Sequence, residues 1–104
     1  MMEQQVHKAA RTRDVTTLSN ILLIDESQID TLDEDGWTPL HSASLSGYKD
    51  VVELLLAKGA DIDVKANDGR TPLFSASETG HKDVVELLLA KGADIDVKNN
   101  VSGY

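Results

Sequence analysis

The feature that most constrains this chain is an internal repeat of 33 residues. Residues 35–67 and residues 68–100 differ at six positions and are identical at the other 27. A fixed period of about 20 to 50 residues is typical of solenoids, in which each unit buries its apolar face against its neighbours. The repeat therefore predicts a row of similar units.

The repeat also marks out the organisation of the chain. A looser match at an offset of 34 residues aligns Val6 with Leu40 and Ala9 with Ala43. Terminal units of a solenoid are expected to be atypical, because their outer face meets water. We therefore expect a single domain over residues 1–104, with a degenerate N-terminal capping unit (2–34), two full units (35–67 and 68–100), and a tail or truncated start of a further unit (101–104).

Each full unit predicts two helices and a projecting loop. Thr38 is a good N-cap and Pro39 suits the first helical position, so a helix is expected from Thr38 to about Ser46, ending at Gly47. A second helix begins near Asp50, and its two apolar stripes indicate burial on two sides. The stripes consist of Val52, Leu55 and Leu56, and of Val51 and Leu54. Residues 60–69 then predict a hairpin-like loop rather than a stable strand.

The dense motifs within the period resemble those of the ankyrin repeat. From Asp35 the first full unit reads Asp-Gly-x-Thr-Pro-Leu-His-x-Ala, followed by Gly47, Val52, Leu55, Leu56 and Gly59-Ala60-Asp61. The second unit repeats this pattern, except that Phe74 replaces the histidine. The resemblance implies an all-α ankyrin-repeat solenoid of stacked antiparallel helix pairs with projecting β-hairpin-like loops. It also implies protein–protein binding through the loop tips and the exposed side of the first helices.

Charge and composition exclude several classes of function. The net charge of −8 disfavours nucleic acid and anionic membrane, because phosphate groups are held by Lys and Arg. The absence of cysteine excludes disulfides, thiolate metal sites and a cysteine nucleophile. No apolar run is long enough for a signal peptide or a membrane span, so we expect a cytoplasmic location.

No spacing in the chain predicts a metal, cofactor or catalytic site. The three histidines are His7, His41 and His81, and no two of them share a helix face. We expect His41 to be a structural turn residue. The Asp61-x-Asp63 pattern lacks the next oxygen ligand and the glycine of a calcium loop, because Lys65 and Ala66 follow. No serine is paired with a base, and no glycine-rich phosphate loop is present, so the chain is not expected to be an enzyme.

The positions at which the two full units differ point to a binding surface. Most of them fall where the family pattern places loop tips and the exposed end of the first helix. The predicted partner-binding residues are Trp37, Leu45, Ser46, Tyr48, Arg70, Glu78, Thr79 and His81. Trp37 and Tyr48 are the candidate anchors, because rigid aromatic side chains bury a large area at low entropic cost. The competing interpretation is that Trp37 packs over its own loop and that the differences are neutral. The acidic residues between Asp25 and Asp35 are expected to be a solvated edge, or to face a basic partner.

Two functional hypotheses follow. The first is a protein-interaction module that binds a protein partner. An inhibitory subunit of an enzyme or channel would have the same sequence features. The second is a structural segment or engineered scaffold that self-associates through an uncapped C-terminal face, with Leu73, Val85 and Leu88 as the candidate outer residues. The near-identity of the two units fits either recent duplication or consensus-like engineering.

Overall fold

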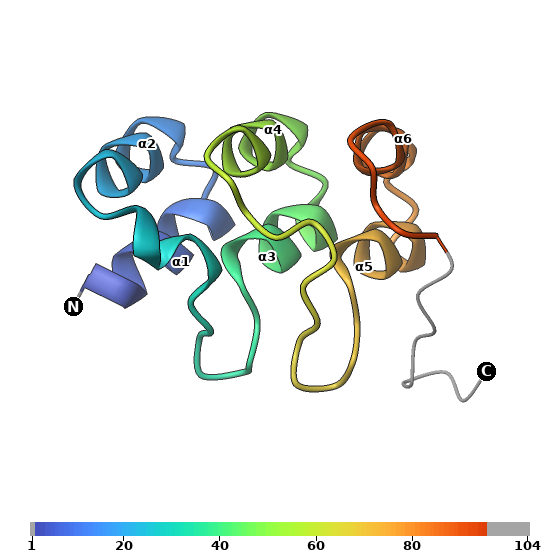
Figure 1. The fold of residues 1–104 in the computed structure, drawn as a ribbon, viewed down its shortest axis with the longest axis horizontal. Coiled ribbons are helices and arrows are strands. Elements are labelled where there is room, and N and C mark those ends of the chain that lie inside the picture. Colours follow the sequence, from blue (N-terminus) through green and yellow to red (C-terminus); the bar gives the residue numbers. More distant parts are fainter. Residues whose placement is uncertain (1, 96–104) are drawn as a thin grey trace.

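The computed structural model describes residues 2–95. Its elements are α1 (Met2–Arg11), α2 (Val15–Ile24), the 3-10 helix η1 (Glu26–Asp30), α3 (Pro39–Ser46), α4 (Lys49–Ala57), α5 (Pro72–Glu78) and α6 (Lys82–Ala90). Helices α1, α3 and α5 form one row, and α2, α4 and α6 form a second row beside it (Figure 1). These residues contain no β-strand and no helix long and apolar enough to cross a membrane. The predicted all-α solenoid of stacked helix pairs is confirmed.

The first helix of the middle unit begins and ends where the sequence predicts. The Thr38 hydroxyl accepts a hydrogen bond from the backbone N–H of His41, and Pro39 occupies the first turn. At the other end Gly47 has a φ of 77°, the left-handed conformation that glycine adopts without strain. These residues fix both ends of α3. Its counterpart α5 ends one residue earlier relative to the repeat, with Thr79 as the C-cap.

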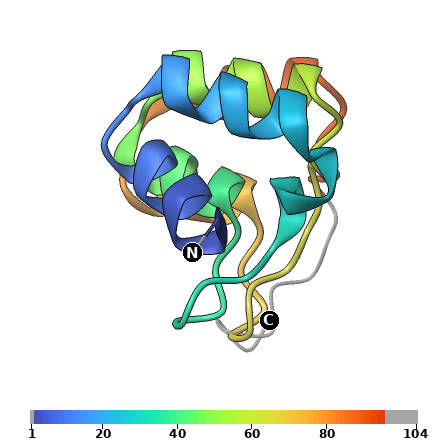
Figure 2. The same ribbon diagram turned by 90° about the vertical axis from the view of Figure 1, so that its left-hand side faces the viewer.

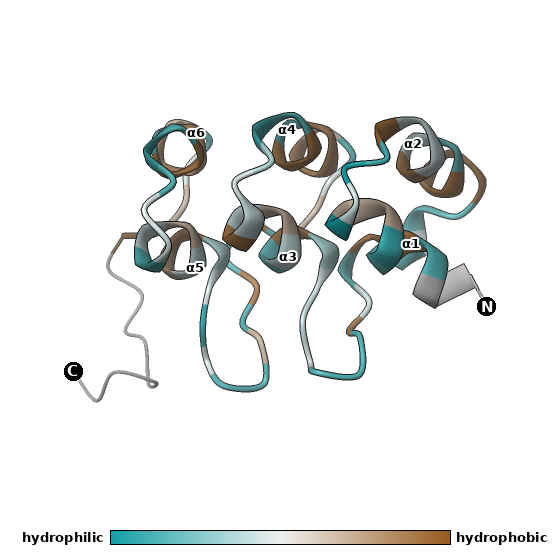
Figure 3. Cartoon of the chain, turned by 180° about the vertical axis from the view of Figure 1, so that it is seen from behind, coloured by the Kyte–Doolittle hydropathy of each residue, from teal (hydrophilic) through white to brown (hydrophobic). Residues whose placement is uncertain are grey.

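The second helix of the middle unit is buried on more than one side. Val51, Val52 and Leu55 are completely buried, and Leu54 and Leu56 are half-buried. Helix α4 packs on α3 in its own unit and lies between α2 and α6 of the neighbouring units. The two predicted apolar stripes are therefore confirmed. Figure 3 shows that α2, α4 and α6 each carry hydrophobic as well as hydrophilic residues.

The loops extend away from both helix rows and have polar tips (Figures 2 and 3). In the first loop the N–H of Gly36 donates to the carbonyl of Asp33 at 3.0 Å, and the N–H of Asp33 donates to Trp37. The second loop repeats this pattern between Ala66 and Arg70. A side chain on Gly36, which has a φ of 79°, would overlap Asn67 of the next loop. The hairpin-like loops are thus confirmed, and they touch one another.

Hydrogen bonds between units follow the same period as the sequence. The carboxylate of Asp30 accepts the N–H of Asp61 at 3.2 Å, and the carboxylate of Asp63 accepts the N–H of Asp94 at 2.9 Å. Asp30 and Asp63 are equivalent positions, as are Asp61 and Asp94. Several of the acidic side chains therefore join neighbouring units. Because they repeat, each unit is attached to the next in the same way.

The N-terminal helix pair follows the 34-residue offset in its core but differs outside it. Val6 and Leu18 are fully buried, as are their partners in the middle unit. Lys8 is exposed, which fits a terminal unit whose outer face meets water. Leu23 and Ile24 are each 77% exposed near the end of α2, which that expectation did not include.

We expect Leu55→Ala to lower the free energy of unfolding by about 2–5 kcal/mol, because Leu55 is completely buried where α4 meets its neighbours. Leu23→Ala is the matched control, since the Leu23 side chain is 77% exposed, and it should change stability by less than about 0.5 kcal/mol. Urea unfolding followed by circular dichroism measures both variants. A cost below about 1 kcal/mol for Leu55→Ala would mean that its burial contributes little to the stack.

Candidate functional site

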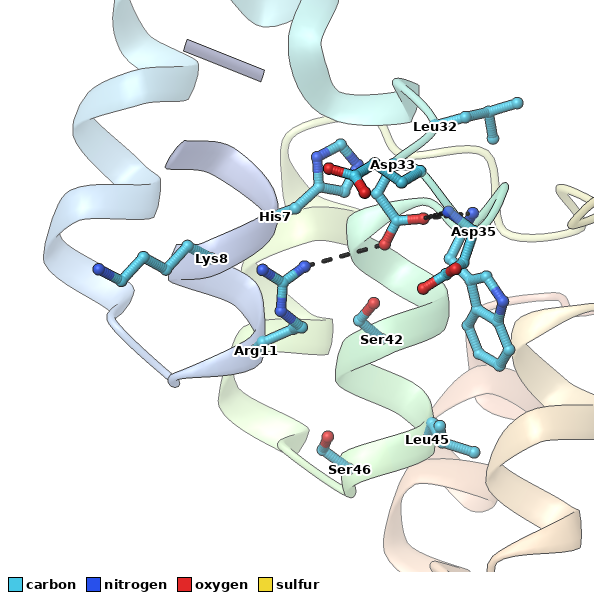
Figure 4. Close-up of a pocket in the computed structure, with 11 residues that line it drawn as sticks. His7, Lys8, Arg11, Leu32, Asp33, Asp35, Ser42, Leu45 and Ser46 are labelled. Atoms are coloured by element: carbon cyan, nitrogen blue, oxygen red, sulfur yellow. Dashed lines mark hydrogen bonds and ion pairs between the residues drawn. The ribbon is translucent and has the colours of Figure 1, made fainter. Parts of the chain in front are cut away.

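A groove of about 900 Å³ lies between α1, α3 and the loop that joins the first two units. Its lining comes from three segments that are far apart in the sequence (Figure 4). They are His7, Lys8 and Arg11 of α1, then Leu32, Asp33, Glu34, Asp35 and Trp37 of the loop, and Ser42, Leu45 and Ser46 of α3. The groove therefore exists only once the first two units are stacked.

The loop wall of the groove is held in place by Asp33. One carboxylate oxygen of Asp33 accepts the backbone N–H of Asp35 at 2.9 Å and that of Trp37 at 3.0 Å. The other oxygen lies 3.8 Å from a guanidinium nitrogen of Arg11 on α1. Both carboxylate oxygens of Asp33 therefore already have partners, and these contacts hold the loop in its conformation. The side-chain carboxylates of Glu34 and Asp35, at its tip, are exposed and make no hydrogen bond or ion pair within residues 2–95.

His41 supports the loop from below. The backbone N–H of Thr38 donates to Nδ1 of His41 at 3.2 Å, and Nε2 lies 2.8 Å from the carbonyl oxygen of Arg70. Because a backbone N–H can only donate, Nδ1 is unprotonated and Nε2 carries the hydrogen. Burial lowers the pKa of the His41 imidazole, which favours this neutral form. The expected structural role of His41 is confirmed, and it extends to the next loop.

His7 has a similar role, which the sequence interpretation missed. Its side chain is buried, and its Nε2 lies 2.8 Å from the carbonyl oxygen of Thr31. The signal was available, because the 34-residue offset aligns His7 with His41. Among the described residues, no three His, Asp or Glu side chains converge in a way that could hold a metal ion.

Trp37 and Leu45 give the groove its apolar character. The indole of Trp37 stands edge-on to the His41 ring, with the ring centroids 5.7 Å apart. Both Trp37 and Leu45 are half-buried, so each keeps part of its surface available. The backbone N–H of Trp37 is bonded to its own loop through Asp33, and the residue also lines the groove.

Ser42 places a hydroxyl in the groove. The residue is only 8% exposed, and its side chain faces the space between α1 and α3 (Figure 4). Within residues 2–95 this hydroxyl makes no hydrogen bond, and its oxygen stays accessible to water. It can therefore bond either to water or to a polar atom of a ligand. The sequence interpretation missed Ser42, because a serine in both units carries no distinguishing signal.

The equivalent positions of the next unit are occupied differently. A guanidinium nitrogen of Arg70 lies 3.0 Å from the carboxylate of Glu78, and the Arg70 guanidinium lies 5.6 Å from the centroid of the Phe74 ring. Arg70 also pairs with Asp68 at 3.4 Å. Three of the six differences between the units therefore form one set of contacts. Trp37, His41 and Leu45 in the first full unit correspond to Arg70, Phe74 and Glu78 in the second.

The remaining predicted residues lie near the turns between helices. The Tyr48 ring lies 5.6 Å from the guanidinium of Arg13 in the preceding unit. The ring of His81 lies against Gly47 of its preceding unit. The Thr79 hydroxyl donates to the carbonyl of Ser75 at 2.9 Å, within the last turn of α5. The groove thus contains Trp37, Leu45 and Ser46 of the eight predicted residues, and it adds others that only the stacking brings in.

Comparison with known proteins decides the family. Residues 6–99 match the family described as ankyrin repeats in three copies. This chain belongs to the ankyrin repeat family. The ankyrin repeat domain-containing protein 49 of Homo sapiens is 40% identical over 50 residues, which are 48% of this chain and 21% of that protein. The Bos taurus protein of the same name is 41% identical over 49 residues, which are 47% of this chain and again 21% of the relative.

Family membership supports a coarse functional statement. Ankyrin repeats generally act as protein-interaction modules and are typically non-catalytic. The match to these two relatives spans about a fifth of their length. The match therefore gives no information about the activity of these longer proteins as a whole.

We expect the stability of this ankyrin protein to fall as the pH decreases from about 7.5 to about 5.5, in part through His41. Its pKa is lowered in the folded state, so the unfolded chain binds the proton more readily. This contribution is complete above the unfolded pKa of 6.5 and is lost as the pH falls below it, towards the folded pKa. His41→Phe should flatten this pH dependence, although the variant will be less stable overall. Urea unfolding at a series of pH values measures the slope, and an unchanged slope in the variant would contradict the assignment.

Proposed function

We propose that this ankyrin-repeat protein is a non-catalytic interaction module that binds a protein partner through the groove between α1, α3 and the first loop. The supporting observation is that Trp37 and Leu45, both half-buried, line a groove whose loop wall is held by Asp33. A rigid aromatic anchor in a preformed groove binds at low entropic cost. Trp37, Leu45 and Ser46 are the proposed first contacts.

The other predicted contacts have a secondary part in this proposal. Arg70, Glu78 and Thr79 extend the same row of first helices, but Arg70 and Glu78 already pair with one another at 3.0 Å. A partner would have to replace that ion pair, so their net contribution is expected to be small. Tyr48 and His81 contact the preceding units, and we propose that they act mainly by supporting the stack.

The proposal can be tested by selecting binders from a displayed peptide library against the wild-type protein. We expect Trp37→Ala and Leu45→Ala each to weaken the selected binders by about tenfold, because each removes about 1–2 kcal/mol of buried apolar contact. Tyr48→Ala is the matched aromatic control outside the groove, and it should leave affinity within about twofold. Calorimetry measures binding, and thermal melts verify that each variant is folded.

Binders that lose no affinity in the Trp37 and Leu45 variants would exclude the groove as the binding surface. Equal losses from Trp37→Ala and Tyr48→Ala in folded proteins would also contradict the proposal. In that case binding would depend on the stack as a whole.

A second candidate function is self-association through the side of α5 and α6 that faces away from α3 and α4. Leu40 and Val52 are fully buried by the following unit, whereas the equivalent Leu73 and Val85 are only half-buried. Leu89 is 40% exposed. The expectation that Leu88 lies on this face was wrong, because Leu88 is completely buried. Leu89, the next residue of the helix, is the exposed leucine on this face instead.

For this second candidate we expect wild-type protein to form a dimer at high concentration and Leu89→Lys to remain a monomer, since a charge on an apolar contact opposes burial. Leu23→Lys is the control, because Leu23 is exposed on the first unit. Size exclusion with light scattering measures the mass. A strictly monomeric, folded wild-type protein at high concentration would exclude this association.

A further inference from the structure

We infer, resting on the proposed function, that the groove binds an extended peptide segment in which Lys or Arg side chains alternate with an apolar side chain. This specifies the chemical class of the partner for the surface formed by α1, α3 and the first loop. The inference depends on four features of that surface: two unpaired carboxylates, the apolar side chains of Trp37 and Leu45, the accessible hydroxyl of Ser42, and the contacts of the equivalent positions in the next unit.

The carboxylates of Glu34 and Asp35 provide the charge. Both residues line the groove and are exposed, and neither carboxylate group makes a hydrogen bond or ion pair in the described part of the chain. Asp33 beside them is already engaged with Arg11 and with backbone N–H groups. With a net charge of −8, the whole chain adds to the attraction for cations. Basic side chains are therefore the complementary ligands at the loop tip.

The two basic residues of the groove do not cancel this preference. Arg11 lies 3.8 Å from the carboxylate of Asp33, so its charge is compensated locally. The Lys8 side chain extends away from the loop and its acidic residues (Figure 4). The loop tip thus presents two carboxylates whose charge is not compensated by a neighbouring cation.

The apolar part of the segment would contact Trp37 and Leu45. Leu32, on the same wall, is 47% exposed and enlarges this apolar area. The face of an indole also attracts cations within about 6 Å, which favours Lys or Arg next to the apolar side chain. These apolar side chains therefore suit a segment that combines both types of residue.

Ser42 places a hydroxyl on the same surface. The hydroxyl faces the groove and makes no hydrogen bond within residues 2–95, so it is open to a ligand atom. An extended peptide carries backbone N–H and C=O groups along its whole length, and either could pair with this hydroxyl.

The next unit contains the same chemistry within one chain. There Arg70 replaces Trp37, and its guanidinium lies against the Phe74 ring while pairing with Glu78 and Asp68. A basic side chain is thus held between an aromatic ring and carboxylates. In the first full unit Trp37 takes the position of Arg70, and Asp35 takes that of Asp68. A basic side chain of the proposed segment would lie between this indole and the loop carboxylates.

The experiment uses two defined probes, acetyl-Lys-Leu-Lys-Leu-Lys-amide and its counterpart with Glu in place of Lys. Trp37 is the only tryptophan of the chain, so its fluorescence reports on the groove itself. The test variant is the double substitution Glu34→Gln and Asp35→Asn. The matched control is Glu53→Gln with Glu86→Gln, which removes the same number of exposed carboxylates from α4 and α6.

We expect the basic peptide to change Trp37 fluorescence with saturation, and the acidic peptide not to bind. The groove double variant should weaken the basic peptide by about fivefold to tenfold, and the control double variant by less than about twofold. Equal losses from both double variants would overturn the inference, because general charge attraction would then explain binding. Binding of the acidic peptide, or no binding of the basic one, would overturn it as well.

The library binders separate this inference from the proposed function. If these binders depend on Trp37 and Leu45 but are unaffected by Glu34→Gln and Asp35→Asn, the groove binds partners and the basic class is wrong. If no binder depends on Trp37 or Leu45, the groove itself is excluded and both proposals fail.

Discussion

Each helix pair of this protein is held in place by the pair beside it, and this stacking is the constraint on which the rest of the structure depends. A single pair buries apolar side chains on only part of its surface, so Val51, Val52 and Leu55 become fully buried only between two neighbours. The same stacking aligns polar groups. His41 reaches the backbone of the next loop, and Asp30 and Asp63 each accept an N–H from the following unit. Because these bonds recur with the sequence period, units with nearly the same sequence attach in the same way.

The candidate site forms where the N-terminal unit packs against the first full unit, whose sequence differs from it. The N-terminal pair presents Arg11 opposite a loop that Asp33 holds in shape, and the space between them is the groove. One unit further along, Arg70 and Glu78 pair across the equivalent positions. Two of the differences between the full units are therefore linked by a contact. Where the first full unit has Trp37 and Leu45, the second has Arg70 and Glu78, which form an ion pair. The surface with unpaired carboxylates and exposed apolar side chains described above belongs to the first full unit.

Local signals in the sequence predicted the helices well and the site only in part. Thr38, Pro39 and Gly47 act within one helix, through capping and backbone conformation, so the bounds of α3 follow from neighbours in the chain. Tyr48 was predicted on the same grounds as Trp37, but its ring packs beside Arg13 of another unit. Ser42 and His7 were missed, because their importance depends on burial by residues far away in the sequence. Leu89 rather than Leu88 lies on the outer face, because successive residues of a helix are rotated by about 100° about its axis. A run of consecutive leucines in the sequence does not show which of them faces outward.

The sequence by itself determined the period, the helix starts at Thr-Pro and the family, because these depend on local backbone chemistry repeated along the chain. Only the tertiary structure decided which side chains share the groove, that Asp33 is committed while Glu34 and Asp35 are not, and that the Ser42 hydroxyl has no partner within residues 2–95. The reason is physical. These properties arise from distances between atoms of different units, and such distances are set by how the units pack.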